Sequence, residues 1–128
     1  MTDQFRSWAG VPTKKARTAT LRSLGAAESI TLIVNQPLIL GRSSADPAVG
    51  RLLGQFGDVS RDHAEVTLHE DGTVVIVDIE SSYGTFVAGE RLPVRARRRV
   101  QLPVELRLGG ECYLTLVAGA ADADPGDR

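Results

Sequence analysis

Cysteine, tryptophan and long apolar runs are scarce in this chain of 128 residues. The single cysteine, Cys112, excludes an internal disulfide, and its place in the alternating stretch 112–116 predicts a small core residue. The first fifteen residues contain no apolar run of signal-peptide length, and no run elsewhere is long enough to cross a bilayer. We therefore expect a cytoplasmic protein with no membrane insertion.

An excess of charge of one sign is also missing. The chain has 15 Lys and Arg and 16 Asp and Glu, a formal net charge of -1, so no global field steers it toward nucleic acid or anionic lipid. Any anion binding must then come from a local arrangement of donors. The 42% of hydrophobic and 24% of charged residues are typical of an ordinary soluble domain, and the length suits one domain.

Short apolar stretches separated by turn residues fill the chain from residue 17 to residue 117. In the clearest, 64–69, apolar and polar side chains alternate strictly, and Glu70–Gly72 then forms a turn into an apolar strand at 73–77. We expect further strands at 18–24, 30–34, 38–40, 85–87, 100–102, 104–108 and 112–117. This pattern predicts an all-β fold, a two-sheet antiparallel β-sandwich with its loops gathered at the ends.

The remaining segments have weaker patterns. Residues 1–16, with Phe5 and Trp8, are expected to form a flexible N-terminal arm or to fold back on the domain of 17–117. Residues 118–128 are small and acidic and predict a disordered tail. Within 43–59 the apolar Leu52, Leu53 and Phe56 predict either a short helical turn that covers one edge of the sandwich or a partner contact.

Three polar, glycine-containing segments stand at the ends of expected strands: Gly41-Arg42-Ser43, Ser60-Arg61-Asp62-His63 and the stretch 78–87. Their order and spacing resemble the signature of the forkhead-associated (FHA) domain, which is G-R, then S-R-x-H, then D-x-x-S-x-N-G-T-F-V. The resemblance covers roughly residues 17–117. It implies an FHA/SMAD-like sandwich whose loops at one end form the binding site, and a phosphothreonine-dependent interaction module that acts as a signalling adaptor.

A phosphate group carries about -1.5 to -2 charge and three acceptor oxygens, which must be met by donors. Arg42 offers a fork of N–H donors and Ser60 a hydroxyl. The resemblance implies three groups of site residues: Arg42, Ser60 and Ser82 at the phosphate, Ser43, Arg61 and Tyr83 at the peptide, and Gly41, His63, Ser81, Gly84 and Thr85 in support of the loops.

One residue departs from the signature, because Tyr83 stands where the family has an asparagine. A phenol cannot reproduce an amide that both donates to and accepts from peptide main chain. Tyr83 then either forms an aromatic wall for the peptide or marks a phosphate-independent scaffold domain in a larger assembly, such as a secretion or regulatory complex.

Two other classes of function fit the sequence poorly. An enzyme would have to use Ser60, His63 and Asp78, but no Gly-x-Ser-x-Gly elbow is present, so we expect no catalysis, no cofactor and no metal. The arginines at 95 and 97–99 lack interleaved aromatic residues, which favours a solvated face over a nucleic-acid site. The expected partner is a protein that carries phosphothreonine, such as a Ser/Thr kinase or its substrate.

Overall fold

The computed structural model of the protein describes residues 18–23 and 28–119, so the expected arm and most of the expected tail lie outside the described residues. The elements are β1 (Thr18–Ser23), β2 (Ser29–Ile33), β3 (Leu38–Leu40), α1 (Pro47–Leu53), β4 (Ala64–Leu68), β5 (Val74–Asp78), β6 (Thr85–Val87), β7 (Glu90–Arg91), β8 (Arg97–Val100), β9 (Val104–Leu108) and β10 (Cys112–Ala118).

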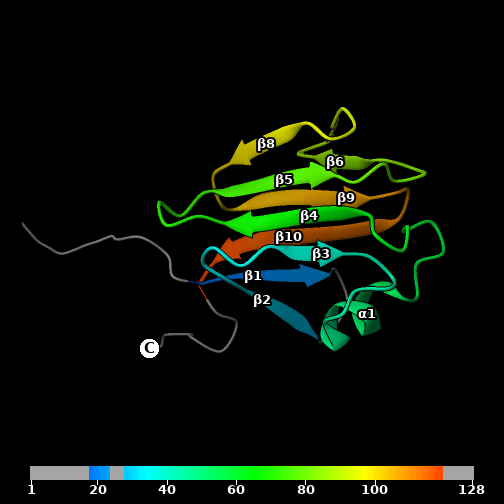
Figure 1. Cartoon of the computed structure of the whole chain (residues 1–128), viewed down its shortest axis with the longest axis horizontal. Helices are drawn as coiled ribbons and strands as arrows, with labels where there is room; N and C mark the ends of the chain where they lie inside the picture. Colours follow the sequence, from blue (N-terminus) through cyan, green and yellow to red (C-terminus); the bar gives the residue numbers. More distant parts are fainter. Residues whose placement is uncertain (1–17, 24–27, 120–128) are drawn as a thin grey trace, which may run out of the picture.

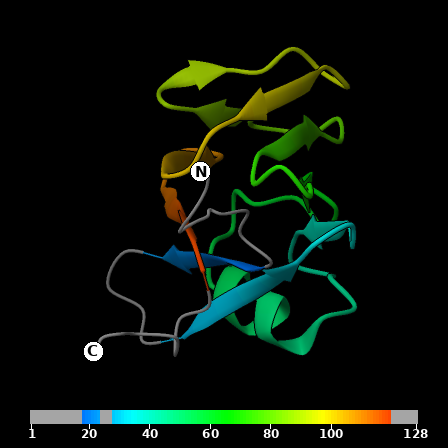
Figure 2. The same cartoon turned by 90° about the vertical axis from the view of Figure 1, so that its left-hand side faces the viewer.

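The strands form two antiparallel sheets. One has six strands in the order β2-β1-β10-β9-β6-β7, and the other has four in the order β3-β4-β5-β8 (Figure 1). The helix α1 lies at the edge near β2 (Figure 2). The predicted all-β sandwich is confirmed.

The hairpin of β4 and β5 shows why the alternating sequence folds this way. The apolar residues of β4 are buried and pair across the ladder with β5, as Val66 does with Ile76. In the turn, Gly72 has a φ of 88°, and the Asp71 carboxylate accepts hydrogen bonds from the backbone N–H and the hydroxyl of Thr73 at 3.0 and 2.6 Å. The alternation of side chains and the residues of the turn therefore favour the same register between β4 and β5.

The core lies between the sheets and draws residues from nearly every strand. Cys112 is fully buried in it, as its alternating context predicts, and burial raises the pKa of its thiol to about 12. The thiol is therefore protonated at neutral pH and serves as a small apolar side chain.

The structure decides between the two alternatives for segment 43–59 and corrects the expected strands in two places. Segment 43–59 contains a seven-residue helix, α1, whose start is capped by the Asp46 carboxylate accepting the Ala48 N–H at 2.9 Å, and whose Leu52 and Leu53 are buried. The strand expected at 100–102 instead spans 97–100, because Arg97 to Val100 pair with β5. The two-residue strand β7 was not expected, since its exposed residues Glu90 and Arg91 carry no apolar signal.

The chain direction brings several loops to one end of the molecule. In Figure 1 β3, β5 and β9 end on the right, and β4 begins there, so the segments after β3, before β4 and after β5 gather at that end. The turn between β4 and β5 lies at the opposite end. Among residues 18–23 and 28–119, no helix has the length and apolar character needed to span a membrane.

Candidate functional site

The three polar segments meet at this loop-bearing end and are hydrogen-bonded to one another. The backbone N–H of Arg42 donates to the Ser60 carbonyl at 3.2 Å, and that of Ser43 donates to the Arg61 carbonyl at 3.1 Å. The third segment joins them through the N–H of Ser82, which donates to the Ser60 hydroxyl oxygen at 3.1 Å. Segments up to 40 residues apart in sequence thus form one rim.

Close approach of two of these backbones explains the glycine at position 41. A Cβ on Gly41 would lie 1.9 Å from the carbonyl oxygen of Arg61, a separation that no side chain can adopt. Any larger residue would push the Arg42 segment away from the Ser60 segment. Gly41 therefore sets the spacing on which the neighbouring Arg42 depends.

Arg42 is exposed on this rim and its guanidinium is oriented. Its Nε donates to the carbonyl of Val59 at 2.5 Å, whereas the two terminal NH₂ groups have no partner among the described residues. Arg42 also forms no ion pair with any residue of 18–23 or 28–119. The side chain therefore presents donors, with its full charge, to an incoming anion.

The hydroxyls of Ser60 and Ser82 complete the polar part of the rim. Ser60 is half-buried, and its oxygen accepts the Ser82 N–H, so its own proton is left to donate elsewhere. Ser82 is exposed, as are Ser43 and Arg61. All three predicted phosphate-binding residues thus belong to one hydrogen-bonded rim.

His63 is fully buried beneath the rim and bonds backbone on both sides. Its Nδ1 accepts the Ser60 N–H at 3.0 Å, which assigns the proton to Nε2, and Nε2 then donates to the Gly84 carbonyl at 2.8 Å. Burial lowers the pKa of His63, an effect that the Gly84 bond and two nearby carboxylates only partly offset. Both ring nitrogens are occupied, so the imidazole joins two loops and is not placed to deprotonate the Ser60 hydroxyl.

A second buried group, Asp78, braces the loop 79–84. Asp78 is only 1% exposed. Its carboxylate accepts hydrogen bonds from the hydroxyls of Ser81 and Thr85 at 2.5 and 2.6 Å, and from the Ser81 N–H at 3.3 Å. The Ser81 hydroxyl oxygen in turn accepts the Gly84 N–H at 3.0 Å. We expected Ser81, Gly84 and Thr85 to support this loop, and all three make hydrogen bonds within it; Asp78 is in addition the acceptor that Ser81 and Thr85 share.

Gly84 ends this loop in a conformation that favours glycine. Its φ is +93°, and a Cβ there would lie 2.8 Å from Nε of Arg91. The preceding residue, Tyr83, is 62% exposed and forms no hydrogen bond with a described residue. The aromatic side chain at the position of the family asparagine therefore projects from the rim.

Two features were missed or left open by the sequence. Asp58 holds the turn after β9, because its carboxylate accepts the Gly110 N–H at 2.5 Å. In the basic run, Arg95, Arg98 and Arg99 pair with Glu80, Glu90 and Asp71 at 3.4, 2.9 and 3.6 Å. These carboxylates neutralise most of the run, as the solvated-face interpretation expects.

Within 18–23 and 28–119, no group of three or more His, Cys, Asp or Glu is arranged to hold a metal ion.

Solved structures of the same fold are similar over most of the chain. The FHA domain of the CT664 protein from Chlamydia trachomatis matches with a TM-score of 0.65 and 24% identity, over 80% of this chain and 99% of that one. The N-terminal FHA domain of S. cerevisiae Rad53p, solved with a phosphothreonine peptide, matches with a TM-score of 0.65 and 19% identity, over 80% and 94% of the two chains.

Sequence comparisons agree with the structural ones. A protein phosphatase 1 regulatory inhibitor subunit PPP1R8 homolog of Arabidopsis thaliana is 45% identical over 51 residues, 40% of this chain, and the chain spans 12% of the length of that relative. The family model of the FHA domain matches residues 38–109, the stretch that contains all three rim segments. This chain belongs to the FHA domain family, whose members are protein-interaction modules.

Proposed function

We propose that the protein binds a phosphothreonine-containing segment of another protein at the rim formed by Arg42, Ser60 and Ser82. The observation that carries the proposal is the guanidinium of Arg42, oriented by Val59 and unpaired among the described residues, beside two serine hydroxyls. Phosphate is the anion whose size and three acceptor oxygens suit such a set of donors. The complex of Rad53p with a phosphothreonine peptide supports the same use of a related fold.

The strength of these contacts is sufficient for regulated binding. Hydrogen bonds to a charged group contribute about 1.5 to 3 kcal/mol each, and a micromolar complex has a binding free energy of about 8 kcal/mol. Two or three phosphate contacts thus decide whether the complex forms. A kinase acting on the partner would then switch the interaction on, which makes the protein an adaptor in Ser/Thr kinase signalling.

Fluorescence polarisation with a library of phosphothreonine peptides tests the proposal. Matched threonine and glutamate peptides should bind at least tenfold more weakly, and Arg42→Ala should abolish phosphopeptide binding. Phosphoserine lacks one methyl group, worth about 0.8 kcal/mol when buried, so its affinity should fall several-fold. The control is Arg99→Ala, which removes an arginine that pairs with Asp71 in the turn between β4 and β5, and it should leave affinity unchanged. That turn lies at the end of the molecule opposite the rim (Figure 1).

The exposed Tyr83 favours a second candidate, a scaffold domain that binds protein without reading phosphate. A phenol replaces the amide that would bond peptide main chain, so recognition by apolar contact becomes more important. The two candidates differ in one measurement. A partner that binds wild-type protein and Arg42→Ala equally, and loses affinity with Tyr83→Ala, would establish the scaffold function and contradict the phosphate-dependent one.

A further inference from the structure

The outer face of the six-stranded sheet carries a row of four side chains from four strands. The strand register pairs Arg91 of β7 with Phe86 of β6, Phe86 with Arg107 of β9, and Arg107 with Tyr113 of β10. The chain neighbours of Phe86, Arg107 and Tyr113 are buried in the core, so these side chains point away from it. We call the set the aromatic–arginine row. It lies on the face of the sheet, whereas the rim lies at the ends of the strands.

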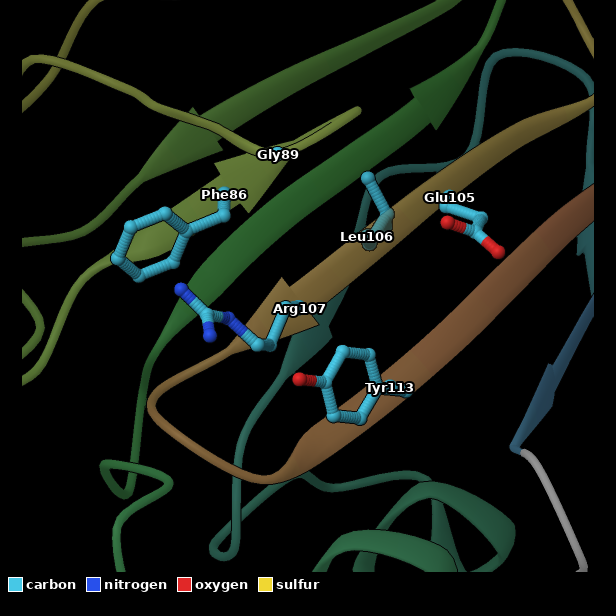
Figure 3. Close-up of a pocket in the computed structure, with 6 residues that line it drawn as sticks. All are labelled: Phe86, Gly89, Glu105, Leu106, Arg107 and Tyr113. Carbon is cyan, nitrogen blue, oxygen red and sulfur yellow. The ribbon is translucent and has the colours of Figure 1, made fainter.

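The side chains of the row are stacked on one another. The Arg107 guanidinium lies 4.0 Å from the centre of the Phe86 ring and 5.9 Å from that of Tyr113, and the Arg91 guanidinium lies 5.9 Å from Phe86 (Figure 3). Stacking engages the flat faces of the guanidinium groups and leaves their N–H edges to donate outward. Both arginines are therefore oriented before any ligand arrives, which lowers the entropic cost of binding one.

The same face of the sheet continues from the row toward the other end of the molecule. Thr115 follows Tyr113 by two residues on β10 and pairs with Arg22 of β1 and Glu105 of β9. This second set lies about 7 Å farther from the turn between β9 and β10, since a strand rises about 3.4 Å per residue. A shallow depression of about 270 Å³ lies beside the row, and a second of the same volume is lined in part by Arg22 and Thr115. The face thus offers two hollows on either side of β10.

Positive charge dominates this face. Arg22, Arg91 and Arg107 have no carboxylate within 4.0 Å among residues 18–23 and 28–119, whereas Glu105 is the acidic side chain that lines the first depression. Two copies of the face would bring like charges together, so a second copy of this chain is disfavoured as the occupant. A partner that supplies carboxylates is favoured.

A single strand of nucleic acid would also supply negative charge, but it fits the row poorly. A base stacks on a free ring face, and the Arg107 guanidinium already lies 4.0 Å from the centre of the Phe86 ring. Within the row, the open aromatic surface is that of Tyr113, which is 51% exposed. Glu105 would repel a phosphate backbone that followed the strand. Arginine together with tyrosine is instead the composition of energetically dominant residues in protein–protein interfaces.

We propose that this face is a second protein-binding surface, which takes an acidic segment of a partner and requires no phosphate. Asp or Glu side chains of that segment accept hydrogen bonds from Arg91 and Arg107, and an apolar side chain packs against Tyr113. A carboxylate opposite Glu105 is repelled, so the partner places a neutral or basic residue there. Since the surface does not include Arg42, the protein can hold one segment at the rim and another on the sheet.

A phage-displayed library of random, unphosphorylated peptides, selected on the whole chain, tests this inference. The recovered peptides should be rich in Asp and Glu, and synthetic copies are then measured by fluorescence polarisation. Arg91→Gln combined with Arg107→Gln should weaken their binding about tenfold. Raising the ionic strength from about 0.1 M to about 1 M should weaken it as well, because the Debye length falls from about 10 Å to about 3 Å.

Control variants assign the binding to this face. Arg97→Gln makes a matched charge change on the other sheet, because Arg97 is exposed on β8 and has no carboxylate within 4.0 Å in the described part of the chain. It should leave the affinity unchanged, as should Arg42→Ala and Tyr83→Ala at the rim. Tyr113→Ala should weaken binding with both arginines still present. Thermal melting of each variant checks that it is folded.

Three outcomes would overturn the inference. They are the recovery of no acidic peptide, equal binding of the recovered peptides to wild-type protein and the double variant, and loss of binding with Arg42→Ala, which would place the peptides at the rim. A single-stranded oligonucleotide that binds more tightly than the peptides, and depends on Arg91 and Arg107, would assign the face to nucleic acid instead. These measurements use no phosphopeptide, so their failure leaves the proposed function standing, and the failure of phosphopeptide binding leaves this inference standing.

Discussion

The Nε atom of Arg42 donates to the carbonyl oxygen of Val59 at 2.5 Å, and this bond orients the guanidinium while leaving its charge uncompensated. Val59 is 1% exposed, so the acceptor belongs to the rigid part of the domain. A carbonyl oxygen orients the guanidinium group without forming an ion pair with it. The bond therefore holds Arg42 in position while its positive charge stays available to attract an anion.

Arg42→Lys tests whether this geometry matters beyond the charge. Lysine keeps one positive charge but cannot bond Val59 and present a planar fork at once. We expect phosphothreonine peptides to bind about tenfold or more weakly, a loss of about 1.4 kcal/mol, with unchanged thermal stability. Isothermal titration calorimetry measures the affinity. Equal affinities of the two proteins would show that the orientation of the fork contributes nothing.

Gly41→Ala should destabilise the domain, because the new Cβ would lie 1.9 Å from the Arg61 carbonyl oxygen and the two backbones would have to separate. The expected cost is about 1 to 3 kcal/mol of unfolding free energy, measured by urea denaturation, with weaker phosphopeptide binding. Gly57→Ala is the matched control, since a Cβ there meets nothing within 4 Å. Similar effects of the two substitutions would argue against the close approach.

The Asp78 carboxylate should show energetic coupling to Thr85. Asp78→Ala leaves buried donors without an acceptor and should cost about 2 to 4 kcal/mol, whereas Thr85→Val removes one hydrogen bond and should cost about 1 kcal/mol. Because they share a bond, the double variant should lose less than the sum. Strict additivity in chemical denaturation would contradict the shared bond. Asp62→Ala, at an exposed carboxylate, should change stability little.

His63 should make stability depend on pH in a defined direction. Its pKa is lowered in the folded state from an ordinary value of 6.5, so the unfolded chain binds the proton first as pH falls. The stabilisation that neutral His63 contributes to the folded state is therefore fully present above about pH 6.5. It decreases as the pH falls from there toward the lowered pKa of the folded state. Urea denaturation between about pH 7.5 and pH 5 measures the decrease.

Two variants check that the pH dependence belongs to this imidazole. His63→Asn should lower stability at neutral pH but flatten its dependence on pH in that range. His69→Gln should retain the dependence, because His69 makes none of the loop contacts of His63. A wild-type protein whose stability is constant or increases over this interval would contradict the assignment.

Strands whose apolar side chains alternate with polar ones could be located from the sequence to within about one residue. β9 has the expected bounds and β4 begins as predicted, because one buried face imposes a period of two. β3 and β6 do not alternate, but Pro37, Gly41, Gly84 and Gly89 mark their ends. β8 was misplaced because its arginines carry no such signal and pair through backbone bonds to β5. β7 was missed for the same reason, since a two-residue edge strand depends on its neighbours alone.

The sequence alone determined the fold class and indicated the loop residues that we expect to bind an anion, because side-chain period and short motifs are local properties. Only the tertiary structure decided that Arg42, Ser60 and Ser82 share one rim, that Val59 orients the arginine, and that Asp78 holds the loop. It also placed Arg91 and Arg107 on either side of Phe86, from three different strands. Contacts of this kind depend on strand order and register, which no local pattern specifies.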